Sequence, residues 1–205
     1  MKYWTAMVGT RQFDEDALLE VALKAFWQNG FVATSMIDVA QATGVQRGSL
    51  YNAYGDKERL FLLAFDRYAS RFLDFVRQAL SKPDPAVALT ALFKGAIANM
   101  TEGAPSRGCL TTKTVIELPL AGKAIEARVK RLIEDFTALI REVLSTPAAR
   151  RKLGCDPDVA ADLAVTFTRG LAVMERAFRN PRHLERMSEQ FVHILFPQAK
   201  GRRSR

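Results

Sequence analysis

The sequence predicts an all-α fold, and three observations support this prediction. Apolar residues recur every three or four positions over long stretches, which is the period of a helix with one buried face. The strict alternation of apolar and polar residues that is typical of a half-buried strand is absent. The pairs Asp84-Pro85 and Asp156-Pro157 have the order of a helix cap followed by the first helical residue.

Three helices are expected in the first 55 residues. The first can be capped by Asp14, and it carries its apolar residues on one stripe before it ends near Gly30. The second is expected at about 36–43 and the third at about 47–54, so that only a short turn separates them.

The two short helices and the turn between them are typical of a helix-turn-helix. Ala40 is small enough for the helices to approach each other, and Gly44 can adopt the backbone conformation of a tight turn. Apolar side chains can hold the two helices together, and a hydroxyl can cap the first of them. The apolar residues are Val45 and Leu50, and the capping candidates are Thr34 and Ser35.

A long helix is expected from its cap, Asp56, to about Leu80, and it would connect the first three helices to the rest of the chain. Prolines then separate further helices that each carry an apolar stripe. The last two could pack within one subunit, or pair with the same helices of a second subunit as a four-helix bundle. The helices are expected from Pro85 to about Thr101, from Cys109 to just before Pro119, over 121–145, from Pro157 and from Pro181.

The charge of the chain is unevenly distributed. The net charge is +8, but residues 1–60 carry six basic and seven acidic residues, and four positive charges lie within 200–205. Bulk charge therefore does not indicate nucleic-acid binding, whereas a helix-turn-helix with a few well-placed cations does. The two cysteines form no disulfide framework, and the sequence has no signal peptide and no apolar run of about 20 residues. We therefore expect a cytoplasmic protein.

One series of residues has a specific order and spacing: Gly30, Thr34-Ser35, Asp38-Val39-Ala40, Gly44-Val45, Gly48-Ser49-Leu50-Tyr51 and Lys57-Glu58-x-Leu60. Across roughly residues 14–62 this pattern closely resembles the N-terminal domain of TetR-family transcriptional regulators. Tyr54 departs mildly from it, because the family most often has Phe there. The resemblance implies an N-terminal three-helix helix-turn-helix domain and a C-terminal helical bundle that dimerises through its last two long helices.

The resemblance also implies partners and a division of the chain. The partners would be a double-stranded DNA operator, a second copy of the chain and a small-molecule effector, with no cofactor and no membrane. We expect a helix-turn-helix DNA-binding domain over 1–55, a helical ligand-binding and dimerisation domain over 56–198, and a basic disordered tail over 199–205.

The second helix of a helix-turn-helix lies in the major groove, with its first residues near the base edges. Arg47 could pair with guanine, and Asn52 or Gln46 with adenine. Tyr51 and Lys57 match positions that usually contact phosphates in the family. The alternative is that these are ordinary solvated residues. The candidate DNA-binding residues are Thr34, Ser35, Gln46, Arg47, Gly48, Ser49, Tyr51, Asn52 and Lys57.

Cys109 is a candidate sensor residue. A cysteine in the first turn of a helix is close to the positive end of the helix dipole, and Lys113 lies one turn further on the same face. With Arg107 nearby, these charges could lower the pKa of the thiol and make it reactive. The surrounding segment resembles TetR-like repressors that sense electrophiles through a cysteine. The alternative is a small buried hydrophobe, and Cys155 is interpreted as incidental.

Aromatic and methionine stripes in the C-terminal helices are either walls of an effector cavity or plain core. Arg169, Glu175 and Arg176 are likewise either polar contacts of that cavity or solvated charges. The candidate pocket or sensor residues are Cys109, Lys113, Phe65, Tyr68, Phe72, Met100, Phe136, Phe167 and Met174. The candidate dimer-interface residues are Leu163, Phe167, Leu171, Phe178, Leu184, Met187 and Phe191.

These observations predict a homodimeric repressor that an effector, or modification of Cys109, releases from its operator. Sequence signatures of hydrolases, metalloproteases and nucleotide-binding enzymes are missing, so no enzymatic activity is expected. His183 and His193 have no nearby cysteine, which argues against a metal site. The alternatives are an activator with the same DNA-binding domain, or a helical small-molecule-binding or electrophile-scavenging protein without a regulatory role.

Overall fold

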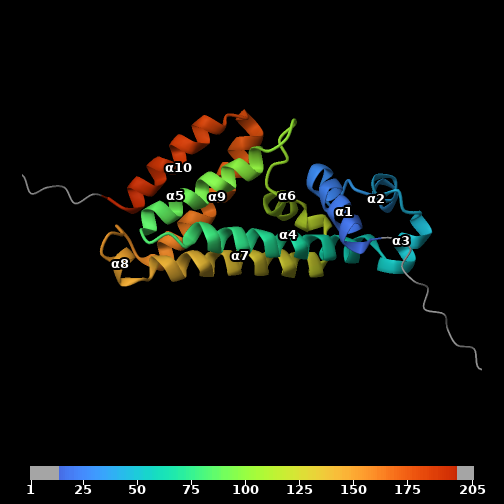
Figure 1. Ribbon diagram of the computed structural model, residues 1–205, viewed down its shortest axis with the longest axis horizontal. Helices are drawn as coiled ribbons and strands as arrows, with labels where there is room; N and C mark the ends of the chain where they lie inside the picture. Colours follow the sequence, from blue (N-terminus) through green and yellow to red (C-terminus); the bar gives the residue numbers. More distant parts are fainter. Residues whose placement is uncertain (1–13, 198–205) are drawn as a thin grey trace, which may run out of the picture. The chain divides into compact units, whose positions relative to one another are not determined.

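The computed structural model describes residues 14–197 (Figure 1). Within this range every regular element is a helix, which confirms the all-α prediction. The expected basic tail at 199–205 lies outside the described residues, as do residues 1–13. The chain divides into two compact units, one ending at Phe65 and the next beginning at Asp66. This division falls inside the long helix α4 (Lys57–Leu80), whereas the domain boundary expected from the sequence lies just before that helix.

The first unit is built from short helices with defined starts. Asp14 accepts hydrogen bonds from the first-turn amides of its helix. Ser35 and Asp38 form a reciprocal capping box, in which each side chain accepts from the other residue's backbone amide. Asp56 accepts from the amide of Arg59 at 2.8 Å. The helices of this unit are α1 (Glu15–Asn29), α2 (Met36–Thr43), α3 (Arg47–Tyr54) and the first turns of α4.

The helix-turn-helix of this unit has the turn that the sequence predicts. Gly44 ends α2 with a φ of 70°, in the left-handed region that favours glycine. Val39 on α2 and Leu50 on α3 have no exposed surface, so the two helices are held together by apolar contact. Behind them the rings of Phe26 and Phe61 meet edge to face, with centroids 5.1 Å apart.

The second unit is a helical bundle. Within it α7 packs on α9, and α5 packs on α10 and α9, while the shorter α6 contacts α7 and α9 (Figure 1). Asp84 and Asp156 cap helices whose first residue is proline, as expected. The elements are the rest of α4, α5 (Pro85–Thr101), α6 (Leu110–Glu117), α7 (Lys123–Leu144), α9 (Pro157–Phe178) and α10 (Pro181–Leu195).

Two further elements were not expected from the sequence. A 3-10 turn, η1 (Leu118–Leu120), follows α6, and a single helical turn, α8 (Pro147–Arg150), follows α7. Neither is long enough to show a helical period, and α8 is marked only by the cap-proline pair Thr146-Pro147.

The last two long helices each carry apolar residues on two faces. Leu171 and Leu184, both expected at a dimer interface, are buried in the core of their own subunit and are therefore not available to a partner. Phe167 and Phe191 stack on each other in parallel, with ring centroids 4.3 Å apart. A second face remains exposed in the single chain: its apolar residues are Val159, Leu163, Val173, Met174 and Phe178 on α9, and Met187 and Ile194 on α10.

Candidate functional site

The first candidate site is the exposed surface of α3. The helix begins at Arg47, directly after Gln46, and has no acidic residue in its first turn. Gln46, Arg47 and Asn52 are exposed, and 40% of the surface of Tyr51 is accessible. The guanidinium of Arg47 lies over the ring of Tyr51, 5.3 Å from its centroid. The surface therefore offers a cation, amide groups and a phenol within two turns of one helix.

Gly48 lies in the middle of this surface. A side-chain carbon added at this position would meet no heavy atom within 4 Å, so packing within the chain does not require a glycine. The absent side chain instead leaves the backbone of α3 accessible from outside, which a close-fitting partner could use.

Three other predicted DNA contacts have roles within the first unit. The hydroxyl of Thr34 is buried and donates to the carbonyl of Gly30 at 2.6 Å, so it does not face solvent. Ser35 is exposed and caps α2. The ammonium of Lys57 lies over the ring of Phe31 and donates to the Phe31 carbonyl at 2.9 Å. Lys57 therefore holds the α1–α2 loop in place.

The second candidate site is a pocket inside the C-terminal unit. It holds about 420 Å³ of empty space, its open mouth included, and its walls come from α4, α5, α7 and α9 and from the start of α6. The structure brings together five of the predicted pocket residues, Tyr68, Phe72, Met100, Cys109 and Phe136. It adds Phe75, Leu92, Ala96, Asn99, Thr168 and Arg169.

The other predicted pocket residues lie elsewhere. Phe65 is fully buried and stacks on Phe61 within the first unit. Phe167 stacks on Phe191, and Met174 is exposed on the outer face of α9. Lys113 is half-buried one turn beyond Cys109, and burial lowers its pKa.

Arg169 is the cation that contacts the thiol of Cys109. Its Nη1 donates to Sγ at 3.7 Å, and its guanidinium carbon lies 5.9 Å from the centroid of the Phe136 ring. Burial raises the pKa of Cys109, but Arg169, the Thr112 hydroxyl and the first-turn amides of α6 outweigh this, so that the pKa of Cys109 is lowered overall.

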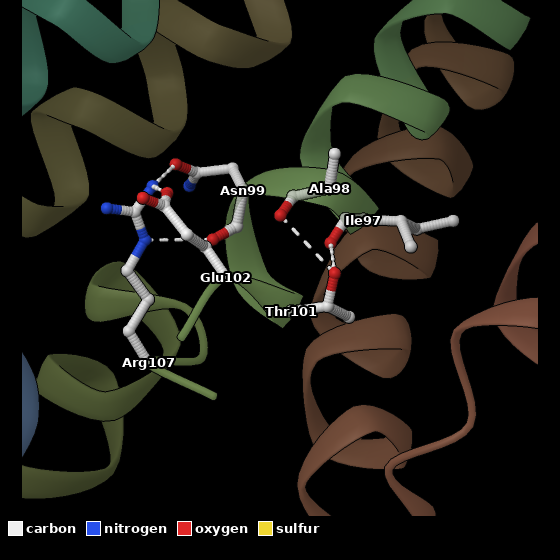
Figure 2. A network of polar contacts seen from close by, with 6 residues as sticks. All are labelled: Ile97, Ala98, Asn99, Thr101, Glu102 and Arg107. Atoms are coloured by element: carbon white, nitrogen blue, oxygen red, sulfur yellow. Dashed lines mark hydrogen bonds and ion pairs between the residues drawn. The ribbon is translucent and has the colours of Figure 1, made fainter. Parts of the chain in front are cut away.

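Arg107, which was expected beside the sulfur, has other partners. Its Nε donates to the backbone carbonyl of Asn99 at 2.9 Å, and its Nη2 forms an ion pair with Glu102 at 2.5 Å. Its Nη2 also donates to the side-chain oxygen of Asn99 (Figure 2). Arg107 therefore ties the α5–α6 loop to the end of α5.

Three charged residues of α9, whose roles the sequence does not decide, have different environments. Arg169 is half-buried in the pocket wall, Glu175 is buried, and Arg176 is exposed. Glu175 accepts from the hydroxyl of Ser106 at 2.5 Å, and Arg176 donates to the Ser106 carbonyl at 3.0 Å. Both thus hold the α5–α6 loop onto α9. Sequence spacing could not identify Arg169, because its partner Cys109 lies 60 positions earlier in the chain.

Two family models match the chain. The model described as bacterial regulatory proteins, tetR family, matches residues 18–64. A tetracyclin repressor-like C-terminal domain matches residues 85–191, which is more than half of the chain. The chain belongs to the TetR family. The N-terminal match covers α2 and α3 completely, and the C-terminal match covers α5 to α9 and most of α10.

The curated proteins that the chain resembles include transcriptional repressors. The chain is 48% identical to the HTH-type repressor ComR of Escherichia coli over 60 residues, which is 29% of each chain. It is 24% identical to the HTH-type repressor DhaR of Mycobacterium sp. over 183 residues, 87% of this chain and 88% of DhaR. The ComR match is thus local, whereas the DhaR match extends over most of both chains.

Solved structures have the same fold. A cysteine mutant of the regulator CifR, bound to a 26-bp double-strand operator, is 25% identical with a TM-score of 0.79, covering 90% of this chain and 98% of CifR. The reduced form of E. coli NemR is 17% identical with a TM-score of 0.80, covering 90% and 97% of the two chains. No helix within residues 14–197 is long and apolar enough to cross a membrane.

Proposed function

We propose that this TetR-family protein is a transcriptional repressor that binds operator DNA as a homodimer and is released by an effector. The observation that carries the proposal is the exposed polar surface of α3, which is presented by a helix-turn-helix within the family match. The operator complex of CifR supports the same role for this chain. We expect the protein to act in the cytoplasm, without a cofactor and without enzymatic activity.

DNA reading would depend on α3. Its N-terminal residues would enter the major groove, where Arg47 and Asn52 can form bidentate hydrogen bonds with guanine and adenine. Ser49 and Tyr51 would contact phosphates or base edges beside them, and Gly48 would allow the backbone to come close. Lys57 would act through the α1–α2 loop that it holds, and Ser35 through its position at the start of α2.

A second copy of the chain would cover the exposed apolar face of α9 and α10. Large apolar residues such as Phe178 and Ile194 are more than half exposed there, and covering them would be favourable. A two-fold dimer would present two copies of α3 to two half-sites, which matches a near-palindromic operator.

Release would require an effector that prefers the conformation that does not bind DNA. The pocket beside Cys109 is a suitable effector site because α4, which supplies Tyr68, Phe72 and Phe75 to it, also supplies Phe61 to the core of the first unit. A ligand in the pocket, or a covalent adduct on Cys109, would shift α4 because the surrounding side chains are closely packed.

Selection of DNA fragments by the purified protein tests this function. A genomic fragment library is incubated with the full chain at about 150 mM salt, a concentration at which nonspecific electrostatic binding is weak. We expect enrichment of fragments that share one near-palindromic sequence. Recovery of fragments without a common sequence would contradict the proposal and favour a small-molecule-binding or electrophile-scavenging protein.

A further inference from the structure

We propose that the pocket beside Cys109 binds one-ring aromatic carboxylates reversibly, with Arg169 as the partner of the carboxylate. This inference rests on the proposed function, because it names the chemical class of the effector. It is carried by the combination of flat aromatic walls with two donor groups, the Arg169 guanidinium, which has no carboxylate partner within residues 14–197, and the Asn99 amide NH₂ group.

The walls of the pocket are suited to a flat apolar ligand. The rings of Tyr68 and Phe72 stack with centroids 6.0 Å apart, and Phe72 meets Phe136 edge to face at 5.1 Å. Phe75 completes this side, and its ring lies against Gly95 on α5, where a side-chain carbon would come within 2.3 Å of it. A single aromatic ring can pack between such surfaces.

Arg169 is an unusual residue for the wall of an apolar pocket. Its guanidinium is half-buried, and it forms no ion pair with any carboxylate within residues 14–197. Two of its nitrogens donate to the hydroxyl of Thr168, at 3.2 and 3.1 Å, and a third donates to the sulfur of Cys109 at 3.7 Å. A planar guanidinium in this setting binds a carboxylate well, since its fork can donate two parallel hydrogen bonds.

Asn99 adds a second donor. Its side-chain oxygen and its backbone carbonyl both accept hydrogen bonds from Arg107, which orients the amide (Figure 2). The oxygen is therefore engaged, and the NH₂ group has no acceptor among the residues that the structure describes.

The hydroxyl groups of the wall already have partners within the chain. Thr168 donates to the carbonyl of Val165 at 2.6 Å and already accepts from Arg169. The hydroxyl of Tyr68 is paired with that of Thr111 at 3.0 Å. No Asp or Glu from the described part of the chain lines the pocket. The site therefore matches a ligand that brings acceptor oxygens and a negative charge.

Occupation of the site would also affect Cys109. A carboxylate on Arg169 would place a negative charge near the sulfur and disfavour the thiolate. Reversible binding and covalent modification of Cys109 would then oppose each other, so that a bound acid protects the thiol from electrophiles.

Calorimetry on the full chain without DNA tests the inference. The probes are 3-phenylpropanoate and its neutral isostere 3-phenylpropanamide. We expect the acid to bind at least about tenfold more tightly than the amide, because only the acid gains charge-assisted hydrogen bonds. Arg169→Met should remove this difference, and Arg131→Met, which alters an exposed arginine of α7, should retain it. Gly95→Ala should weaken the binding of both probes, because the added methyl group forces the ring of Phe75 to move.

Equal affinity of the two probes, or no binding of the acid at millimolar concentration, would overturn the inference. If Arg169→Met does not fold, the difference in affinity between acid and amide on the unaltered chain still tests the inference. Alkylation of Cys109 by iodoacetamide is the second readout, and we expect 3-phenylpropanoate to slow it more than the amide does. Operator binding is measured separately: a chain that binds DNA but not the acid contradicts only this inference, and a chain that binds the acid but not DNA contradicts only the proposed function.

Discussion

The DNA-reading surface and the pocket differ in how the chain builds them. The candidate base contacts lie between Gln46 and Asn52, on one short helix whose position depends on the turn at Gly44. The pocket takes residues from four helices and the N-cap of α6, and its polar end joins Asn99, Cys109 and Arg169 from separate parts of the chain. A local surface can be predicted from spacing alone, whereas an assembled pocket depends on tertiary packing. The same holds for α9, where tertiary packing decides which of its apolar residues are buried and which are exposed.

The largest expected effect comes from a charge on the buried side of α9. Leu171 is 3% exposed, so Leu171→Glu would bury an unpaired carboxylate and should lower the free energy of unfolding by about 3 kcal/mol or more. Val173 is 52% exposed in the single chain, so Val173→Glu should leave the subunit folded and shift a dimer towards monomer. Chemical denaturation and light scattering measure the two effects. A folded monomer from Leu171→Glu together with an unchanged dimer from Val173→Glu would mean that the two faces are assigned the wrong way round.

Substitutions on α3 should act on DNA affinity and not on folding. Arg47→Ala or Asn52→Ala should each cost about 1–3 kcal/mol of binding free energy on the selected operator and relax base preference at one position. Gln78→Ala, on the exposed side of α4, is the matched control and should leave affinity unchanged. Fluorescence anisotropy with operator variants provides the measurement. Full affinity and unchanged base preference in both α3 variants would exclude α3 as the reading helix.

The pH dependence of thiol alkylation should show the effect of Arg169 on Cys109. The pKa of Cys109 is lowered, so its thiolate persists to lower pH than that of an ordinary thiol with a pKa of about 8.5. Its iodoacetamide rate should therefore reach a plateau at lower pH than the rate of an ordinary thiol. Arg169→Met should move the Cys109 profile to higher pH. Mass spectrometry at limiting reagent follows the alkylation of Cys109, and identical profiles in the unaltered chain and the variant would show that Arg169 does not act on the sulfur.

Loss of the α2 cap should have the smallest effect. Ser35→Ala removes the hydroxyl that accepts from the Asp38 amide, and should cost about 1 kcal/mol of stability. Hydrogen bonds from the backbone and hydroxyl of Ser35 lower the pKa of Asp38, so its stabilising contribution is present at neutral pH and is lost as pH falls through that lowered value. Thermal unfolding at pH 7 and at acidic pH should therefore show a larger deficit of the variant at pH 7. An equal deficit at both pH values would contradict the role of the capping box.

The sequence allowed most of the fold to be predicted because the helix signals are local. Caps at Asp14, Asp84 and Asp156 and prolines at the first helical positions mark the starts of helices within a residue or two of where they are found. The short α8 and η1 were missed because a helical period needs more than one turn. The partner of Cys109 was misassigned for a similar reason: Arg107 is near in sequence, but α9 brings Arg169 to the sulfur.

Helical spacing also cannot tell which of two apolar faces of a helix is buried in its own subunit. Leu163 and Leu171 belong to one stripe in the sequence, yet Leu163 is exposed and Leu171 is core. That difference follows from the packing of α9 on α5 and α7, which no local pattern encodes.

The most direct test of the proposed function is the stoichiometry and specificity of the complex with the selected operator. Sedimentation or mass photometry with the operator and with a scrambled duplex of the same length, at about 150 mM salt, gives both quantities in one series. A dimeric repressor should place an even number of chains on the operator, one for each half-site, and should bind the scrambled duplex more weakly by about a thousandfold or more. One chain per operator, or equal affinity for the two duplexes, would contradict the proposed function.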